Sequence, residues 1–266
     1  MMNAPLSGRI AVVTGATAGI GEAIARAFAA GGASVVVNGR REDKLNALAQ
    51  ELGGLVVAPA KVAAVAGDAA DAGVIDRMLG AAKEQCGRNS DLVVVNAGRG
   101  LNGSLLTSDM GAWEELIKIN VLGAARLIRA AAEKMLERSV GKVGTGVLTA
   151  GPRDIIAIGS VVGRHVSPFS SMYGGTKFAL HGMIEGVRRE LSAKGIRVTL
   201  IEPGFVVSEF QDVAGYQKGW VKEMFEKIGP PLTPDDVARA VTFVAAQPAG
   251  VHISDLLIRP TRQEYP

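Results

Sequence analysis

The chain has 266 residues, of which 48% are hydrophobic and 21% charged, and its formal net charge is +3. This composition allows a large hydrophobic core and argues against disorder, and so weak a charge gives no reason to expect a nucleic-acid partner. The only cysteine, Cys86, excludes an intramolecular disulfide and a metal site made of several cysteines. We expect a cytoplasmic protein without a signal peptide or membrane span, because the sequence has neither a basic N-terminal stretch before an apolar run nor about 18 consecutive apolar residues.

Short apolar runs alternate with longer helical segments along the whole chain. The predicted strands are Arg9–Thr14, Ser34–Val37, Val62–Ala66, Leu92–Val95, Ile155–Ile158, Val198–Ile201 and Leu256–Ile258. The predicted helices are Gly19–Ala30, Lys44–Leu52, Asp71–Gln85, Trp113–Leu136, Tyr173–Ala193 and Asp235–Ala246. Strands that are apolar on both faces and joined by helices indicate an α/β fold, with a parallel sheet covered on both sides. We predict a single domain over residues 1–266, because no internal repeat or linker interrupts this pattern.

Two segments are less regular. Ser139–Asp154 is glycine-containing and longer than a helix-to-strand connection needs, so we predict a loop or short hairpin there. Phe205–Pro234 follows a strand end and carries several aromatic residues. Open α/β sheets bind ligands at the carboxyl ends of their strands, and residues 205–234 are therefore predicted to form a lid over the substrate.

The first predicted strand leads into T-G-A-T-A-G-I-G, residues 14–21, and then into a helix. Gly15, Gly19 and Gly21 allow a tight turn and a close approach of the backbone to a pyrophosphate. The helix N-terminus adds free N–H groups and a positive dipole. This turn therefore predicts nucleotide binding, although its spacing is G-x-x-x-G-x-G and not G-x-G-x-x-G.

The end of the second predicted strand, V-V-V-N-G-R-R, favours NADP(H) over NAD(H). A site for NAD needs a carboxylate at this place for the ribose hydroxyls, and Asn38 stands there instead. Arg40 and Arg41 follow, and guanidinium groups suit a phosphate by charge and geometry. Taken alone, Arg41 fits a solvated charge in the first turn of a helix better than a phosphate contact.

Tyr173 and Lys177 lie four residues apart at the start of a predicted helix, in S-M-Y-G-G-T-K. Residues at this spacing share one face of a helix, and an ammonium group beside a phenol favours the phenolate. We therefore expect Lys177 to lower the pKa of Tyr173 toward the range in which acid–base catalysts work. Taken alone, the pair fits an ordinary surface contact better than a catalytic pair.

Further motifs follow the other strands: G-D-A-A-D (67–71), V-N-A-G (95–98), Asn120 in K-I-N-V, and Ser160 at the end of I-I-A-I-G-S. Together with the glycine-rich turn and Y-x-x-x-K, they resemble the short-chain dehydrogenase/reductase family over roughly residues 7 to 260. The resemblance implies a Rossmann-like doubly wound sheet with strand order 3-2-1-4-5-6-7. It also implies an oxidoreductase that transfers a hydride between NADP(H) and a carbonyl or secondary alcohol.

The resemblance further implies a role for each matching residue. Tyr173 would be the acid or base, Ser160 would bind the substrate oxygen, Lys177 would hold the nicotinamide ribose, and Asn120 would anchor a water. Asp68 would meet the adenine, Asn96 the adenine-side ribose region, and Pro203 to Ser208 the nicotinamide. The complete predicted cofactor set is Gly15, Thr17, Gly19, Ile20, Gly21, Asn38, Arg40, Arg41, Asp68, Asn96, Ala97, Gly98, Tyr173, Lys177, Pro203, Gly204, Val206 and Ser208.

Some features depart from the family pattern or allow other interpretations. V-N-A-G stands where the family has N-N-A-G, and the connection before the fifth strand is long. A serine hydrolase is not expected, because Ser160 lies in G-S-V-V-G and not in G-x-S-x-G. His165 is either a substrate contact or an exposed loop residue, His181 is read as an ordinary helix residue, and no spacing indicates a metal site.

The substrate is a small carbonyl or alcohol whose identity the sequence leaves open. The segment G-R-H-V-S-P-F-S-S-M-Y and the ending L-L-I-R-P-T-R-Q resemble family members that act on 3-hydroxy acids, serine-like compounds and aldehydes. A 3-oxoacyl-carrier-protein reductase and a non-catalytic NADP(H)-sensing protein are the alternatives. The family also implies a homotetramer, with contacts at Trp113–Leu136 and Tyr173–Ala193 and a reach of Arg259–Pro266 toward a neighbouring subunit.

Overall fold

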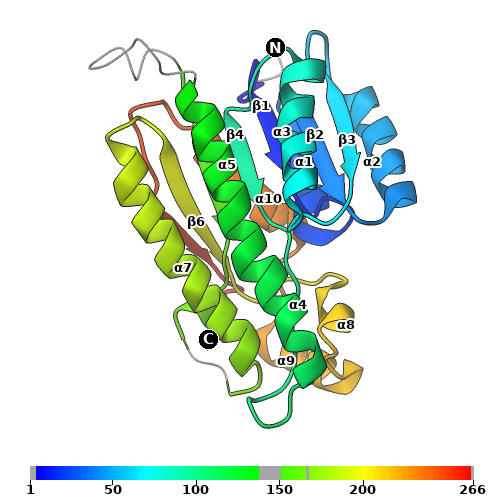
Figure 1. Ribbon diagram of the computed structural model, residues 1–266. Coiled ribbons are helices and arrows are strands. Elements are labelled where there is room, and N and C mark those ends of the chain that lie inside the picture. Colours follow the sequence, from blue (N-terminus) through cyan, green and yellow to red (C-terminus); the bar gives the residue numbers. More distant parts are fainter. Residues whose placement is uncertain (1–3, 138–150, 166–167, 265–266) are drawn as a thin grey trace.

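A computed structural model of the protein describes residues 4–137, 151–165 and 168–264. Its strands form one parallel sheet in the order β3-β2-β1-β4-β5-β6-β7, which confirms the predicted order (Figure 1). The strands are β1 (Ile10–Val13), β2 (Ser34–Gly39), β3 (Val62–Ala66), β4 (Leu92–Val95), β5 (Asp154–Ile158), β6 (Arg197–Pro203) and β7 (Asp255–Ile258). The order reverses between β1 and β4, and open sheets of this kind bind ligands at that switch point.

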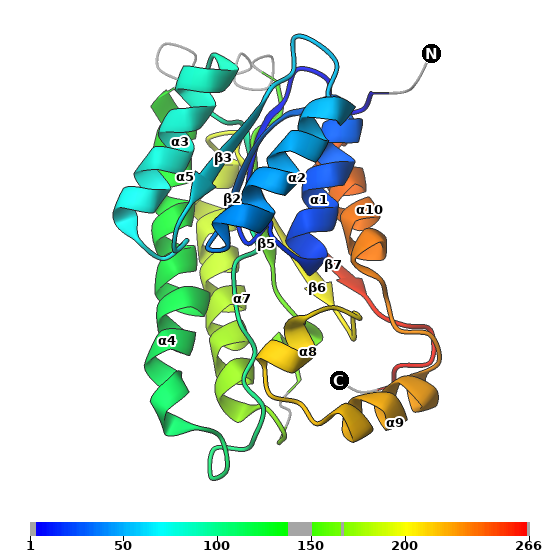
Figure 2. The same ribbon diagram turned by 90° about the vertical axis from the view of Figure 1, so that its right-hand side faces the viewer.

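Helices cover both faces of the sheet, as the apolar strands require. The helices are α1 (Gly19–Ala30), α2 (Glu42–Leu55), α3 (Ala72–Cys86), α4 (Trp113–Ile117), α5 (Ala124–Glu137), α7 (Ser171–Ser192), α8 (Phe210–Val213), α9 (Lys218–Ile228) and α10 (Pro234–Ala245). Figure 2 shows α3, α5 and α7 on one face and α1, α2 and α10 on the other. Each face has its own hydrophobic core, the first around Met78, Leu127 and Ile184 and the second around Ile24 and Val241.

The long helix predicted over Trp113–Leu136 is interrupted. Between α4 and α5 lies the π-helical segment η2 (Lys118–Gly123), which contains the buried side chain of Asn120. Such segments widen a helix by one residue per turn and are frequent at functional sites. The hydrophobic periodicity of the segment does not reveal this change, because one extra residue shifts the pattern only slightly.

The structure describes all of one of the two irregular segments and only the end of the other. The predicted lid, residues 205–234, contains α8 and α9 and lies beyond the carboxyl ends of the strands (Figure 2). The loop or hairpin predicted over Ser139–Asp154 falls largely outside the described residues. At its end the prediction is wrong, since Asp154 is the first residue of β5 and pairs with Leu92.

A buried ionic cluster lies at the opposite end of the sheet, where the central strands begin. It consists of Arg9, Asp91, Asp154 and Arg197, each at most 7% exposed. Arg9 Nε donates to Asp91 Oδ1 at 2.7 Å, and Arg9 Nη2 donates to Asp154 Oδ2 at 2.7 Å. Arg197 donates to both oxygens of Asp154, at 2.6 and 2.9 Å. These bonds connect the first residues of β1, β4, β5 and β6, and the pKa of Arg9 is raised because two carboxylates outweigh its burial.

No helix within the described ranges has both the length and the apolar character to cross a membrane. Within the same ranges, no three His, Cys, Asp or Glu side chains gather as a metal site would need.

Candidate active site

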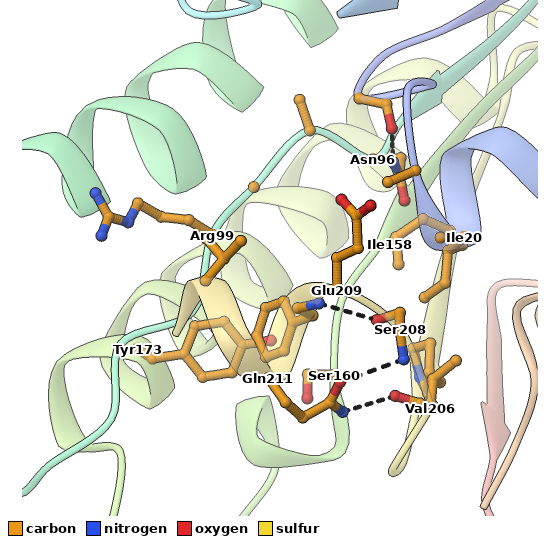
Figure 3. Close-up of a pocket in the computed structure, with 18 of the residues that line it drawn as sticks. Ile20, Asn96, Arg99, Ile158, Ser160, Tyr173, Val206, Ser208, Glu209 and Gln211 are labelled. Atoms are coloured by element: carbon orange, nitrogen blue, oxygen red, sulfur yellow. Dashed lines mark hydrogen bonds between the residues drawn. The ribbon is translucent and has the colours of Figure 1, made fainter. Parts of the chain in front are cut away.

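One cavity of about 530 Å³ lies at the carboxyl ends of the central strands (Figure 3). It brings together most of the predicted site residues: Gly15, Thr17, Gly19, Ile20, Asn38, Arg40, Arg41, Asp68, Asn96, Ala97, Gly98, Ser160, Tyr173, Lys177, Pro203, Gly204, Val206 and Ser208. Gly21 and Asn120 do not line it. Residues that are far apart in the sequence thus meet in one place, with the glycine-rich turn at one end of the cavity and Tyr173 at the other.

The glycine-rich turn between β1 and α1 has the geometry that a pyrophosphate site needs. Gly15 and Gly19 adopt φ values of +66° and +57°, which favour glycine. A Cβ atom at Gly21 would lie 2.4 Å from the carbonyl oxygen of Gly15, so a side chain has no room there. Ala18 precedes α1 and gives no side-chain cap, which leaves the first N–H groups of the helix available to an anion. These residues fit a dinucleotide.

Asn96 supports this turn from the neighbouring strand. Its Nδ2 donates to the carbonyl oxygens of Thr14 and Gly15 at 2.8 and 3.3 Å, and its backbone N donates to Thr14 Oγ1 at 3.1 Å. The resemblance places Asn96 near the adenine-side ribose, whereas in the structure its amide holds the β1 turn against the end of β4. The missing first asparagine of N-N-A-G leaves this contact intact.

The polar side chains at the end of β2, which were expected to face the cofactor, have partners within the protein. Asn38 is fully buried, and its Nδ2 donates to the carbonyl oxygens of Val65 and Gly67 at 2.9 and 3.2 Å. This side chain therefore fixes β2 to the end of β3 and brings no negative charge to the cavity. Arg40 lies beside Glu115, with Nη1 and Oε1 3.4 Å apart.

Arg41 is paired with an acid from the 205–234 segment. Its Nη1 lies 2.7 Å from Glu209 Oε2, and Lys44 Nζ lies 2.9 Å from the other carboxylate oxygen. The hydrogen bonds from Lys44 and Arg41 hold the pKa of Glu209 below its usual value. Figure 3 shows the carboxylate of Glu209 extending into the cavity. The sequence analysis did not select Glu209, although an acid next to Ser208 in a segment expected to cover the site was a usable signal.

The reacting end of the cavity is formed by Tyr173, Ser160 and Lys177. Tyr173 is 8% exposed and lines the cavity together with Ser160, whose nearby hydroxyl lowers the pKa of the phenol. Ser160 ends the β5 connection and its Oγ accepts from the backbone N of Val162 at 3.3 Å, which fixes the side chain. Lys177 Nζ donates to the carbonyl oxygen of Ile158 at 2.8 Å and lies 5.8 Å from the centroid of the Tyr173 ring. The predicted trio therefore lines one cavity.

The pKa of Tyr173 contradicts the expectation from sequence. Burial raises it above the ordinary value of a phenol, and the hydrogen bond from Ser160 only partly opposes this effect. Lys177 does not lower it, because the ammonium group points to the backbone of Ile158 and lies beside the ring rather than at the hydroxyl. Tyr173 is therefore protonated at neutral pH and is ready to act as a proton donor.

Lys177 shows the complementary shift. Burial disfavours its charged form and lowers its pKa to about 8. The side chain is thus still mainly an ammonium group at neutral pH and loses its proton in the mildly alkaline range.

Asn120 lies behind the cavity wall. Its Oδ1 accepts from the backbone N of Arg99 at 2.9 Å, and its Nδ2 donates to the carbonyl oxygen of Arg99 and to Thr176 Oγ1 at 2.9 and 3.0 Å. Thr176 in turn donates to the carbonyl oxygen of Tyr173. Asn120 therefore joins the loop after β4 to the first turns of α7, which carry Tyr173 and Lys177.

His181 and Glu202 support the Ser160 loop, which sequence reasoning did not foresee. The backbone N of Ser160 donates to His181 Nε2 at 3.4 Å, and His181 Nδ1 lies 3.6 Å from Glu202 Oε2. Burial, with Lys177 and Arg164, lowers the pKa of His181 to about 4, so the ring is neutral. Glu202 is 0% exposed and is held by Arg164, whose Nη2 donates to Oε1 at 2.6 Å. The acid within the apolar strand I-E-P-G was the signal in the sequence.

The tail of the chain folds back onto the cavity. Gln263 is 5% exposed, lines the cavity, and accepts at Oε1 from the backbone N of Phe205 at 2.9 Å. This contact holds the start of the 205–234 segment. Part of the ending that was expected to extend toward a neighbouring subunit therefore belongs to this chain's own site.

Comparisons with known proteins agree with this geometry. The sequence profile described as short chain dehydrogenase matches residues 9–218. An uncharacterized oxidoreductase of Staphylococcus epidermidis is 33% identical over 252 residues, which cover 95% of this chain and 97% of that protein. A serine dehydrogenase solved in its closed form with NADP⁺ is 33% identical, with a TM-score of 0.82 and 96% of each chain covered.

A third similar protein is the alcohol dehydrogenase of the archaeon Thermococcus sibiricus, solved with 5-hydroxy-NADP. It is 27% identical, has a TM-score of 0.79, and the match covers 97% of this chain and 99% of that one. The profile match spans most of the chain, and the relatives are matched over nearly their full length. The chain therefore belongs to the short chain dehydrogenase family and is an oxidoreductase.

Proposed function

We propose that the protein is an NADP(H)-dependent oxidoreductase that interconverts a carbonyl compound and a secondary alcohol, with Tyr173 as the acid or base. The observation that carries the proposal is that Ser160, Tyr173 and Lys177 line the same cavity as the glycine-rich turn. When bound, the dinucleotide supplies the hydride for reduction or accepts it in oxidation.

Ser160, Tyr173 and Lys177 each have a separate role in the proposed reaction. Ser160 is held by Val162 and donates to the carbonyl oxygen of the substrate, which stabilises the charge that develops there. Tyr173 gives its proton to the same oxygen as the carbonyl is reduced, and its raised pKa keeps that proton in place beforehand. Lys177, at the next turn of α7, binds the ribose on the nicotinamide side.

A direct test is NADPH oxidation in the presence of a panel of ketones and aldehydes. Turnover that depends on Tyr173 supports the enzyme and excludes a protein that only senses NADP(H). Tight NADPH binding without oxidation by any member of the panel would favour the sensing protein instead. Reduction of acyl-carrier-protein thioesters alone would favour the 3-oxoacyl-carrier-protein reductase.

The preference for NADP(H) is supported by Arg40 and Arg41 at the adenosine end, by the uncharged Asn38, and by similarity to proteins solved with NADP⁺ and 5-hydroxy-NADP. We expect the double variant Arg40→Ala/Arg41→Ala to raise the Kd for NADPH about 10-fold or more, because each charge-assisted bond to a phosphate contributes about 1.5–3 kcal/mol. The Kd for NADH should change little. Isothermal titration measures both values, and an equal loss for the two cofactors would contradict this assignment.

A substitution at Glu209 should have the opposite effect and strengthen the binding of a 2′-phosphate. In the structure it neutralises Arg41 and Lys44, so a 2′-phosphate must compete with it for these cations. Glu209→Gln should therefore lower the Kd for 2′,5′-ADP several-fold and leave that for 5′-AMP unchanged. Arg26→Ala, which removes another exposed arginine that pairs with acids, is the matched control and should alter neither value.

The pKa of Lys177 predicts a pH dependence. In the reduction direction kcat/KM for NADPH, which reports the free enzyme, should fall above about pH 8 as Lys177 loses its proton. The arginine of Lys177→Arg keeps its charge at higher pH. This variant should therefore shift the fall in kcat/KM to a higher pH, even if its maximal rate is lower. Steady-state rates measured at saturating ketone across the alkaline range test this. A profile that stays flat well beyond the pKa of Lys177 would contradict the role of the ammonium group.

A further inference from the structure

The reacting end of the cavity has an aromatic wall, which we define as Phe169, Phe210, Tyr216 and Trp220. All four residues line the cavity together with Tyr173. Tyr216 and Trp220 stack at 5.1 Å with an angle of 16° between their planes, and Phe210 lies 5.5 Å from the Tyr173 ring. A flat surface of this kind binds apolar and aromatic groups, because it removes a large apolar area from water.

The aromatic wall is assembled from separate elements. Phe169 lies before α7, Phe210 begins α8, Tyr216 follows α8, and Trp220 lies in α9. The Ser170 hydroxyl lies near Tyr216 and lowers the pKa of its phenol. Phe205 also lines the cavity, and its ring centroid lies 6.2 Å from that of Trp220. Ring contacts thus hold Tyr216, Trp220 and Phe210 in place along the cavity.

The cations nearest to this wall are engaged elsewhere. Arg99 is paired with Glu115, its Nε is covered, and Figure 3 shows its guanidinium directed away from Ser160 and Glu209. Arg164 donates through two nitrogens to the buried Glu202 and does not line the cavity. Lys177 is directed to the carbonyl oxygen of Ile158. Lys177 and Arg99 line the cavity as well, but Lys177 donates to Ile158 and Arg99 is paired with Glu115. The other described polar side chains that line the cavity near the wall are neutral: Ser160, Ser170, Tyr173, Tyr216 and Gln263.

From this arrangement we propose that the substrate is an uncharged carbonyl compound with an apolar, preferably aromatic, substituent that packs on the aromatic wall, and not an amino acid or hydroxy acid. This inference rests on the proposed function. A carboxylate placed against these rings would lose its hydration without gaining a cation in exchange, which is strongly unfavourable. A neutral ketone instead places its oxygen between the Ser160 and Tyr173 hydroxyl groups and its substituent on the rings. The substrate of the serine dehydrogenase similar in sequence does not meet this requirement.

The test compares two aryl ketones that differ in one charge and one ester methyl group, methyl 4-acetylbenzoate and 4-acetylbenzoate. We expect kcat/KM for the ester to exceed that for the acid by about 100-fold, because the site discriminates against a buried group that it cannot pair. Equal or faster reduction of the acid would overturn the proposal. Trp220→Ala should lower kcat/KM for the ester about 10-fold and leave the Kd for NADPH unchanged. Val221→Ala, on the same helix but lining a different surface hollow, is the control and should retain the wild-type rate.

A binding measurement separates this proposal from the proposed function. The Tyr173→Phe protein saturated with NADPH is titrated with each ketone by calorimetry, which needs no turnover. Tighter binding of the ester supports the substrate class, and tighter or equal binding of the acid overturns it. If the ester binds but the wild-type protein reduces neither compound, the substrate class stands and the assignment of the reaction fails.

Discussion

Replacing Tyr173 with phenylalanine is expected to lower kcat for carbonyl reduction by about 10³-fold, within the range of general acid catalysis. The variant keeps the ring, which packs at 5.5 Å from Phe210, and removes only the hydroxyl that meets Ser160. Since that hydroxyl is the proposed proton donor, the chemical step should slow while the fold and the Kd for NADPH remain close to wild type. Single-turnover oxidation of NADPH and calorimetric titration measure the two quantities.

Tyr216→Phe is the matched control, because it makes the same chemical change within the same cavity. It removes a bond to Ser170 and should lower kcat less than about 10-fold, since its hydroxyl does not reach the reacting oxygen in the proposed mechanism. If Tyr173→Phe retained more than a tenth of the wild-type rate, or if both variants lost activity equally, Tyr173 would not be the proton donor.

Asp154→Ala is expected to destabilise the protein by about 3–5 kcal/mol, the cost of breaking a buried ion pair from one side. Asp154 is 0% exposed and receives hydrogen bonds from both Arg9 and Arg197. Its removal leaves two buried guanidinium groups with too few acceptors, and neither can neutralise by losing a proton. Urea denaturation followed by circular dichroism gives the free energy of unfolding.

The control for this effect is an ion pair of the same chemistry at the surface. Arg26 donates to both carboxylate oxygens of Glu51 at 2.7 and 2.9 Å, but both side chains are largely exposed. Glu51→Ala should therefore change the free energy of unfolding by less than about 1 kcal/mol. Similar losses in the two variants would show that burial does not set the contribution of the cluster at the strand starts.

The sequence was sufficient for the fold because the strong signals are local. All seven strands were found from their apolar runs, with β3 and β4 placed at their observed bounds. The helix Gly19–Ala30 was also placed at its observed bounds, since the glycine-rich turn marks its start. The interrupted helix between Trp113 and Leu136 was missed, because a π-helical segment changes the hydrogen-bond pattern of the backbone and hardly changes the apolar periodicity.

Much of the candidate site was also predictable, because its residues follow strand ends that a parallel sheet brings to one edge. Ser160, Tyr173, Arg40 and Arg41 all line the same cavity. The sequence does not show which partner each polar or charged side chain binds in the folded protein. Asn38 and Asn96 hold strands and turns together, and Arg41 is paired with Glu209 from a distant segment.

The pKa of Tyr173 could not be predicted from the sequence either, because it depends on the partners of side chains in the folded protein. A spacing of four residues places Lys177 near the ring, but the direction of its Nζ and the burial of the hydroxyl depend on β5 and on the 205–234 segment. Desolvation then raises the pKa of Tyr173, which is the reverse of the expected shift, because the lysine charge does not act on the hydroxyl. The buried cluster around Asp154 escapes sequence analysis for a related reason, since Arg9, Asp91 and Arg197 meet it only after four strands have paired.

The most direct measurement is a crystal structure of the protein with NADP⁺ and an unreactive ketone analogue. The proposed mechanism predicts that the Tyr173 Oη and the Ser160 Oγ both lie about 2.6–3.2 Å from the ketone oxygen. A ketone oxygen bound by other groups, with the Tyr173 hydroxyl out of reach, would contradict the assignment of Tyr173 as the proton donor.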